Sequence, residues 1–98
     1  MKVHIPTPLR QYAAGGAAVD VTGHTVGQAL GELIRRFPGL RQHLYSEEGK
    51  LRAFVNIYLN DEDIRYLQKE GTPVRPGDQI SIVPSIAGGS LSGNGVET

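Results

Sequence analysis

The spacing of apolar residues along the chain alternates between a two-residue and a helical period, and these periods predict the order of its elements. Apolar and polar residues alternate over 2–6, which predicts a half-buried strand with Val3 and Ile5 facing the core. A second short alternation over 19–21 follows a turn signal at 14–17. Two strands joined by such a loop indicate a hairpin at the start of the chain.

The strongest helical pattern begins at Thr25. Thr25 and Gln28 have the spacing of a capping box, in which side chains satisfy amides at the helix start. The helix ends before Pro38 and Gly39, which cannot easily continue it. Its apolar residues form one stripe and comprise Val26, Ala29, Leu30, Leu33, Ile34 and Phe37.

Two further strands are predicted after this helix. Over 52–59 one face carries Ala53, Val55, Ile57 and Leu59, and the other carries Arg52, Phe54, Asn56 and Tyr58. The segment 79–83 predicts the last strand, with Ile80 and Ile82 facing inward. Residues 40–45 suggest a short extra turn, and the ambiguous pattern over 64–71 fits a short strand and a helical turn.

This order of elements predicts an α+β fold of the β-grasp, ubiquitin-like type. One main helix packs on one face of a mixed sheet of four to five strands. We expect a single domain over 1–84, followed by a flexible tail over 85–89 and a C-terminal extension over 90–98.

Composition narrows the possible functions. Ten basic and ten acidic side chains balance, so neither nucleic acid nor an anionic membrane surface is an expected partner. The 98 residues contain no cysteine, which excludes thiolate metal sites and a cysteine nucleophile. No apolar run reaches the roughly 20 residues that span a membrane. We therefore expect a cytoplasmic protein.

The residues that often carry catalysis are dispersed. His4, His24 and His43 lack metal-ligand spacing, and the acidic residues at 47–48 and 61–63 fall in turn-like segments. We expect no catalytic residue, no bound metal and no bound cofactor, so the chain is not predicted to be an enzyme.

Two surface features remain open at this point. Phe54 and Tyr58 lie on the outward face of a predicted strand and form a candidate partner-binding surface, unless Leu40, Leu44 or the 64–71 segment covers them. Arg35, Arg36 and Arg41 form a basic cluster, which fits a solvated helix end better than a binding patch.

Four segments form a recognisable set: the helix start 25–30 (TVGQAL), 52–63 (RAFVNIYLNDED), 76–80 (PGDQI) and 84–89 (PSIAGG). In these segments the chain resembles the sulfur-carrier family of molybdopterin-synthase small subunits and thiamine-pathway carriers, in particular its cysteine-biosynthesis branch. A Gly-Gly pair is weak evidence by itself. Its position five residues past a proline that ends the last β-grasp strand is much more specific.

The resemblance implies a mechanism that needs no catalytic side chain. An E1-like activating enzyme uses ATP to adenylate the terminal carboxylate of Gly89, and sulfur then displaces AMP to leave a thiocarboxylate. The segment that enters the partner's active site is Pro84, Ser85, Ile86, Ala87 and Gly88. Glycines suit a narrow channel because they lack Cβ, and an extended chain from Pro84 to Gly89 spans about 15–20 Å.

The chain departs from this pattern because residues 90–98 follow Gly89. We expect a processing peptidase, such as a metalloprotease, to cleave between Gly89 and Ser90. A sulfur-accepting synthase is the further partner that the resemblance implies. Two alternatives stay open: a ubiquitin-like modifier joined to lysines through Gly89, and a β-grasp interaction module that carries no sulfur.

Overall fold

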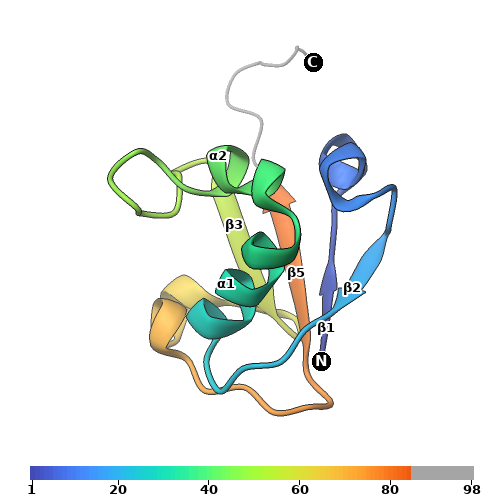
Figure 1. Cartoon of the computed structure of the whole chain (residues 1–98). Coiled ribbons are helices and arrows are strands. Elements are labelled where there is room, and N and C mark those ends of the chain that lie inside the picture. Colours follow the sequence, from blue (N-terminus) through green and yellow to red (C-terminus); the bar gives the residue numbers. More distant parts are fainter. Residues whose placement is uncertain (85–98) are drawn as a thin grey trace, which may run out of the picture.

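The molecule is a mixed five-stranded sheet with its helices packed on one face (Figure 1). The computed structural model describes residues 1–84 of the chain. The strands are β1 (Lys2–His4), β2 (Ala18–Asp20), β3 (Val55–Leu59), β4 (Glu62–Asp63) and β5 (Gln79–Pro84), and they are arranged in the order β2-β1-β5-β3-β4. The α+β, β-grasp prediction is confirmed, and the sheet has the larger of the two expected strand numbers.

β5 is the central strand of this sheet. It runs parallel to β1, with His4 opposite Ser81, and antiparallel to β3, with Val55 opposite Pro84. β1 and β2 form the predicted N-terminal hairpin. The end of the sheet at which β5 finishes, at Pro84, is called the tail end below, and the end at which β5 starts is called the opposite end.

The main helix, α1 (Val26–Arg36), begins with the predicted capping box. The Gln28 amide donates to Thr25 Oγ1 at 3.2 Å, and Gln28 Oε1 accepts from the amide of His24 at 2.9 Å. Gln28 therefore satisfies the amide that precedes the cap residue. A cap of this kind stabilises a helix by about 1 kcal/mol.

The core forms between α1 and the inner face of the sheet. The predicted helical stripe is confirmed: Val26, Ala29, Leu30 and Leu33 are buried, and Ile34 and Phe37 pack against them. The sheet contributes Val3, Val55, Ile57, Leu59, Ile80 and Ile82. Each fully buried side chain of this size contributes about 1.5–3 kcal/mol of hydrophobic free energy.

The strand predicted over 52–59 starts later than expected. The Arg52 amide donates to Leu44 O at 2.9 Å, and the Val55 amide donates to Arg52 O at 3.0 Å. These bonds make a turn just before β3, so Ala53 is exposed instead of facing the core, and Phe54 lies in the turn instead of on the strand. The alternation of apolar and polar residues cannot reveal that the amides of Arg52 and Val55 bond to Leu44 O and Arg52 O instead of to a neighbouring strand.

The remaining elements are short. η1 (Thr7–Ala13), η2 (Pro38–Leu40) and α2 (Arg41–Leu44) gather at the tail end, and η3 (Ile64–Tyr66) and η4 (Lys69–Gly71) follow β4. The extra turn predicted over 40–45 is confirmed. The sequence did not predict η1, because Pro6 and Pro8 only indicated the end of a strand. Among the described residues, no helix is long and apolar enough to cross a membrane.

Candidate functional site

The tail end is where the chain leaves the sheet toward the Gly-Gly motif. Pro84, the first residue of the predicted tail, is held in β5 opposite Val55. The predicted tail residues Ser85, Ile86, Ala87 and Gly88, the reactive Gly89 and the processing position Gly89–Ser90 lie outside the described residues. The structure therefore describes the base of the tail and its surroundings.

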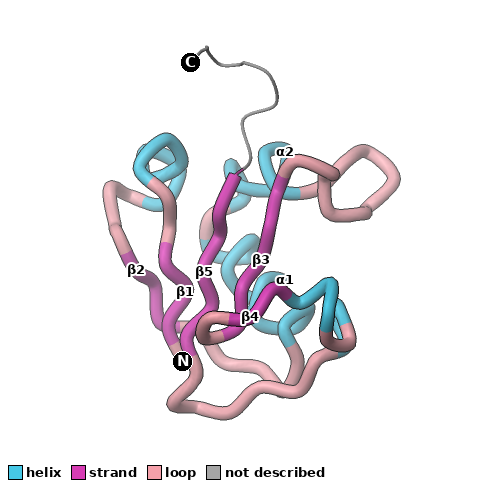
Figure 2. The backbone as a smooth tube through the Cα atoms, turned by 180° about the vertical axis from the view of Figure 1, so that it is seen from behind, coloured by secondary structure: helices cyan, strands magenta, loops and turns pink. Residues whose placement is uncertain are grey.

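Exposed apolar side chains lie beside this base. Phe54 is 47% exposed and Val83 is 42% exposed, and both belong to segments that meet where β3 pairs with β5. Tyr58 is half-buried and pairs with Ser81 across β3 and β5. Figure 2 shows the sheet from the side that no helix covers. The sequence does not predict the exposure of Val83, because its pattern indicates only that this residue belongs to the last strand.

Neither Leu40, Leu44 nor the 64–71 segment covers Phe54 in the structure. Leu40 and Leu44 are fully buried in the core. The 64–71 segment forms η3 and η4, and its Tyr66 side chain is 85% exposed. Phe54 is therefore an exposed aromatic side chain, while Tyr58 keeps only part of its surface accessible.

The basic cluster predicted from sequence divides in the structure. Arg35 and Arg36 both reach Glu32, at 2.7 Å and 3.3 Å, so α1 neutralises part of its own charge. The hydrogen bond from Arg35 is the main cause that holds the pKa of Glu32 below its ordinary value. Arg41 lies on α2 and makes no ion pair within residues 1–84. The expectation of a solvated helix end fits Arg35 and Arg36, whereas Arg41 belongs to a different surface.

The three histidines lie apart from one another. His4 Nε2 lies 2.6 Å from Gln79 Oε1, and the His43 ring packs against Tyr12 with ring centroids 4.3 Å apart. Among the described residues no three acidic or histidine side chains group so as to hold a metal ion. No arrangement of these side chains suggests catalysis.

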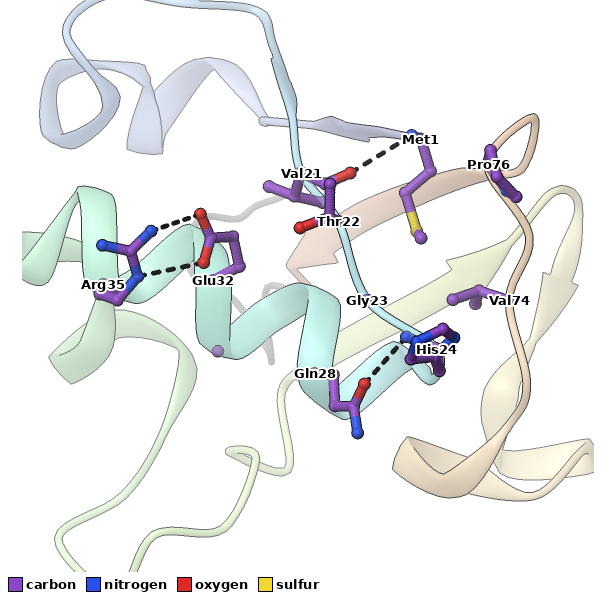
Figure 3. Close-up of a pocket in the computed structure, with 11 residues that line it drawn as sticks. Met1, Val21, Thr22, Gly23, His24, Gln28, Glu32, Arg35, Val74 and Pro76 are labelled. Carbon is purple, nitrogen blue, oxygen red and sulfur yellow. Dashed lines mark hydrogen bonds and ion pairs between the residues drawn. The ribbon is translucent and has the colours of Figure 1, made fainter.

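A pocket of about 600 Å³ lies between α1 and the segments that precede and follow it at the opposite end of the sheet (Figure 3). Its wall includes His24, Gln28 and Val74, and the Glu32–Arg35 ion pair. Gln28 Oε1 and the Glu32 carboxylate already accept hydrogen bonds within the protein. The pocket is far along the sheet from Pro84, so it is not part of the tail-end site.

Comparison with known proteins identifies the class to which this arrangement belongs. A β-grasp domain whose central strand leads into a C-terminal segment is shared with ubiquitin-like carriers and modifiers. The structure resembles CysO in the Amycolatopsis orientalis BexX/CysO complex, with a TM-score of 0.82, 39% identity and coverage of 90% of this chain and 98% of the other. It also resembles the small archaeal modifier protein SAMP1 of Methanosarcina acetivorans, with a TM-score of 0.78, 30% identity and coverage of 90% and 94%.

The sequence comparisons give the family. The ThiS family model matches residues 3–89. The sulfur carrier protein CysO of Mycobacterium tuberculosis is 40% identical over 89 residues, which cover 89% of this chain and 96% of the relative. The chain therefore belongs to the ThiS/MoaD family of sulfur carriers, small proteins that act as substrates and donors for enzymes and are not enzymes themselves.

Proposed function

We propose that this protein carries sulfur as a thiocarboxylate on Gly89 after residues 90–98 have been removed. The observation that carries the proposal is the extent of the family match, which runs through the β-grasp domain and ends at Gly89. The proposal is supported by the position of Pro84 at the end of the central strand, where Phe54 and Val83 are exposed apolar side chains.

The proposed chemistry takes place on the main-chain carboxylate. A carboxylate oxygen of Gly89 attacks the α-phosphate of ATP in the active site of an E1-like enzyme, and pyrophosphate leaves. Hydrosulfide, or a sulfur donor equivalent to it, then attacks the acyl carbon, and the bond to the AMP oxygen breaks. AMP leaves, and Gly89 ends in a thiocarboxylate that a synthase can use as its sulfur source.

The partners follow from these steps. A peptidase, for example a metalloprotease, frees the Gly89 carboxylate by cleaving before Ser90, because a carboxyl group in a peptide bond cannot be adenylated. We propose that the activating enzyme docks on the surface around Phe54 and Tyr58, which the structure extends to Val83. Cysteine biosynthesis is the pathway that the likeness to CysO proteins favours.

Intact mass spectrometry tests this function. Chains 1–89 and 1–98 are each incubated with an adenylating enzyme of a ThiS-family pathway, ATP and sulfide. We expect an oxygen-to-sulfur exchange on chain 1–89 and none on chain 1–98. Equal sulfur loading of both chains would contradict the proposal that residues 90–98 must first be removed. Normal sulfur loading of Gly89→Ala in chain 1–89 would contradict the role of the terminal glycine.

A second candidate is a protein modifier that forms isopeptide bonds through Gly89. The likeness to SAMP1, whose name describes it as a modifier, favours this possibility. Activation is the same in both cases, so the products distinguish them. High-mass conjugates of the tagged chain in its native cell would indicate a modifier, whereas a thiocarboxylate without conjugates would indicate a sulfur donor.

A further inference from the structure

Three arginines on three different segments are found at the tail end. Arg10 lies on η1, Arg41 on α2, and Arg52 in the turn before β3. In the sequence they are separated by 31 and 11 positions, and the spacing of basic residues groups Arg41 with Arg35 and Arg36 instead. Figure 1 shows η1 and α2 at the end of the sheet where β5 finishes.

These segments form one continuous surface. η1 meets η2 where the Tyr12 ring lies over Gly39, and a Cβ on that glycine would lie 3.5 Å from the ring. The same Tyr12 ring packs against His43 of α2. Arg52 Nε in turn donates to Gln42 O of α2 at 2.8 Å. The surface at the tail end therefore runs from η1 through η2 and α2 to the turn before β3.

Two of the arginines are held in position by the main chain. Arg10 Nε donates to Ile5 O at 3.0 Å, just as Arg52 Nε donates to Gln42 O. Their terminal Nη groups make no hydrogen bond or ion pair with other described residues. An arginine fixed through Nε loses less side-chain entropy when its Nη groups bind a carboxylate, so these groups are prepared for a partner.

The charge of this surface also depends on Arg41, the third arginine, and on where the acidic residues lie. Arg41 is exposed, and it lines a hollow of about 760 Å³ together with Arg52 and one carboxylate, that of Glu47. Glu47 pairs with neither arginine within residues 1–84. The acidic turn 61–63 and Asp78 lie at the opposite end, where β3 finishes and β5 starts.

Apolar contact is available within the same surface. Phe54 is half exposed, and the Arg52 guanidinium lies 6.0 Å from the centre of its ring. An exposed aromatic side chain beside Arg52, on a surface that also carries Arg10 and Arg41, fits a protein surface with an apolar pocket and a rim of carboxylates.

From this arrangement we infer that the E1-like adenylating enzyme presents carboxylates that bind Arg10, Arg41 and Arg52 around the entrance of the channel that receives the tail. The inference rests on the proposed function, because it names the surface chemistry of the enzyme that takes the tail. The arginines steer the encounter and set its orientation, and the apolar contact at Phe54 provides the desolvated centre.

A peptide titration tests the arginine surface without the enzyme. The ¹⁵N-labelled full chain is titrated with acetylated hexaglutamate amide, and amide and arginine Nε shifts are followed by NMR. We expect saturable shifts at Arg10, Arg41 and Arg52, and none with hexalysine. Shifts that are absent, or that centre on Arg65, Lys69 and Arg75, would overturn the inference.

Matched charge reversals provide the control. Arg10→Glu with Arg41→Glu alters the tail end, whereas Lys2→Glu with Arg75→Glu makes the same charge change at exposed positions of the opposite end. We expect about a tenfold loss of peptide affinity in the first pair and less than about twofold in the second. Equal losses of peptide affinity in the two pairs would show that only net charge matters, and would contradict a binding site at the tail end. Arg41→Glu alone, at an exposed side chain, serves if the first pair does not fold.

The same variants in chain 1–89 extend the test to the adenylating enzyme. The tail-end pair should slow association about tenfold and reduce its dependence on salt, while the opposite-end pair leaves both unchanged. Unslowed association of the tail-end pair would contradict the inference. If the unmodified chain 1–89 is not charged at all, the result contradicts the proposed function. The arginine surface is tested independently by the peptide titration.

Discussion

Gly23 lies where the segment from β2 passes the first turns of α1, and there is no space for a side chain there. A Cβ on Gly23 would lie 2.9 Å from the amide nitrogen of Ala29 and 3.1 Å from Gln28 Cβ. The first contact is with main chain, which cannot rotate away. Gly31, also close to the pocket of Figure 3, differs because a Cβ there would meet nothing within 4 Å.

These two glycines predict opposite effects of the same substitution. Gly23→Ala should lower the free energy of unfolding by about 1–3 kcal/mol, because the methyl group forces the segment away from α1. Gly31→Ala should raise it by about 0.5–1 kcal/mol, because alanine favours an exposed helical position over glycine. Urea denaturation followed by circular dichroism measures both. A loss in Gly31→Ala as large as that in Gly23→Ala would contradict the packing argument.

At the scale of elements, Tyr45 connects the end of α2 to η4. Its hydroxyl donates to Glu70 Oε1 at 2.9 Å, across 25 positions of sequence. Burial, followed by the charge of Glu70 and this hydrogen bond, raises the pKa of Tyr45 well above its ordinary value. The protonated hydroxyl is thus a structural part of the contact between the two segments.

This contact predicts a loss of stability in alkali. Above about pH 10, the ordinary pKa of tyrosine, the unfolded chain releases the Tyr45 proton while the folded chain retains it. The free energy of unfolding should therefore fall as the pH rises through this range. Tyr45→Phe should be about 1–2 kcal/mol less stable at neutral pH and should show a smaller fall. Urea denaturation between pH 8 and about 11 measures this.

Tyr66→Phe is the matched control for that experiment, because this side chain is 85% exposed and makes no hydrogen bond with other described residues. It should follow the pH profile of the unmodified protein. If Tyr45→Phe also retained the full alkaline fall, the assignment to Tyr45 would be wrong.

The elements that follow from local pattern were predictable, and those that depend on distant partners were not. The α1 stripe and the β5 alternation are local, since each periodic set packs against one side. The start of β3 depends on the bond from Arg52 to Leu44 O, which alternation cannot reveal. η1 depends on packing of Leu9 and Ala13 into the core after a proline pair that indicated only a strand end.

At the scale of the whole molecule, exposed aromatic side chains lie at two separate places. Phe54 is beside the base of the tail, whereas Tyr66 lies on η3, beyond β4. Phe54 has Val83 as an exposed apolar neighbour on the adjoining strand. Under the proposed function, the enzyme that takes the tail covers the first place and leaves the second uncovered.

Alanine substitutions distinguish these places. In chain 1–89, Phe54→Ala should raise the KM for adenylation about tenfold, because a central aromatic contact contributes more than about 1 kcal/mol to binding. Tyr66→Ala should leave KM within about twofold. ATP–pyrophosphate exchange measures both variants. Equal effects on KM would place the docking surface elsewhere.

The candidate site was predictable in part. Its reactive end, Gly89, stays a prediction that rests on a motif and its distance past Pro84. Alternation correctly predicts Tyr58 on β3, but it is wrong for Phe54, which lies in the turn before that strand. The arginine surface was not predictable, because sequence spacing grouped Arg41 with its neighbours on α1. In the folded chain, the bond from Arg52 to Gln42 O and the packing of Tyr12 on His43 instead join α2, which carries Arg41, to the segments that carry Arg10 and Arg52.

The position of β5 between two partner strands also has a mechanical consequence. Any pull on the chain beyond Pro84 acts along β5, and hydrogen bonds to β1 and β3 lie across that direction on both sides. The β1–β5 and β3–β5 hydrogen bonds then resist the force together, in shear. The whole of β5 must slide past both neighbouring strands before the domain unfolds. On an edge strand the same pull would meet a single ladder. We therefore expect the domain to stay folded when the chain beyond Pro84 is pulled.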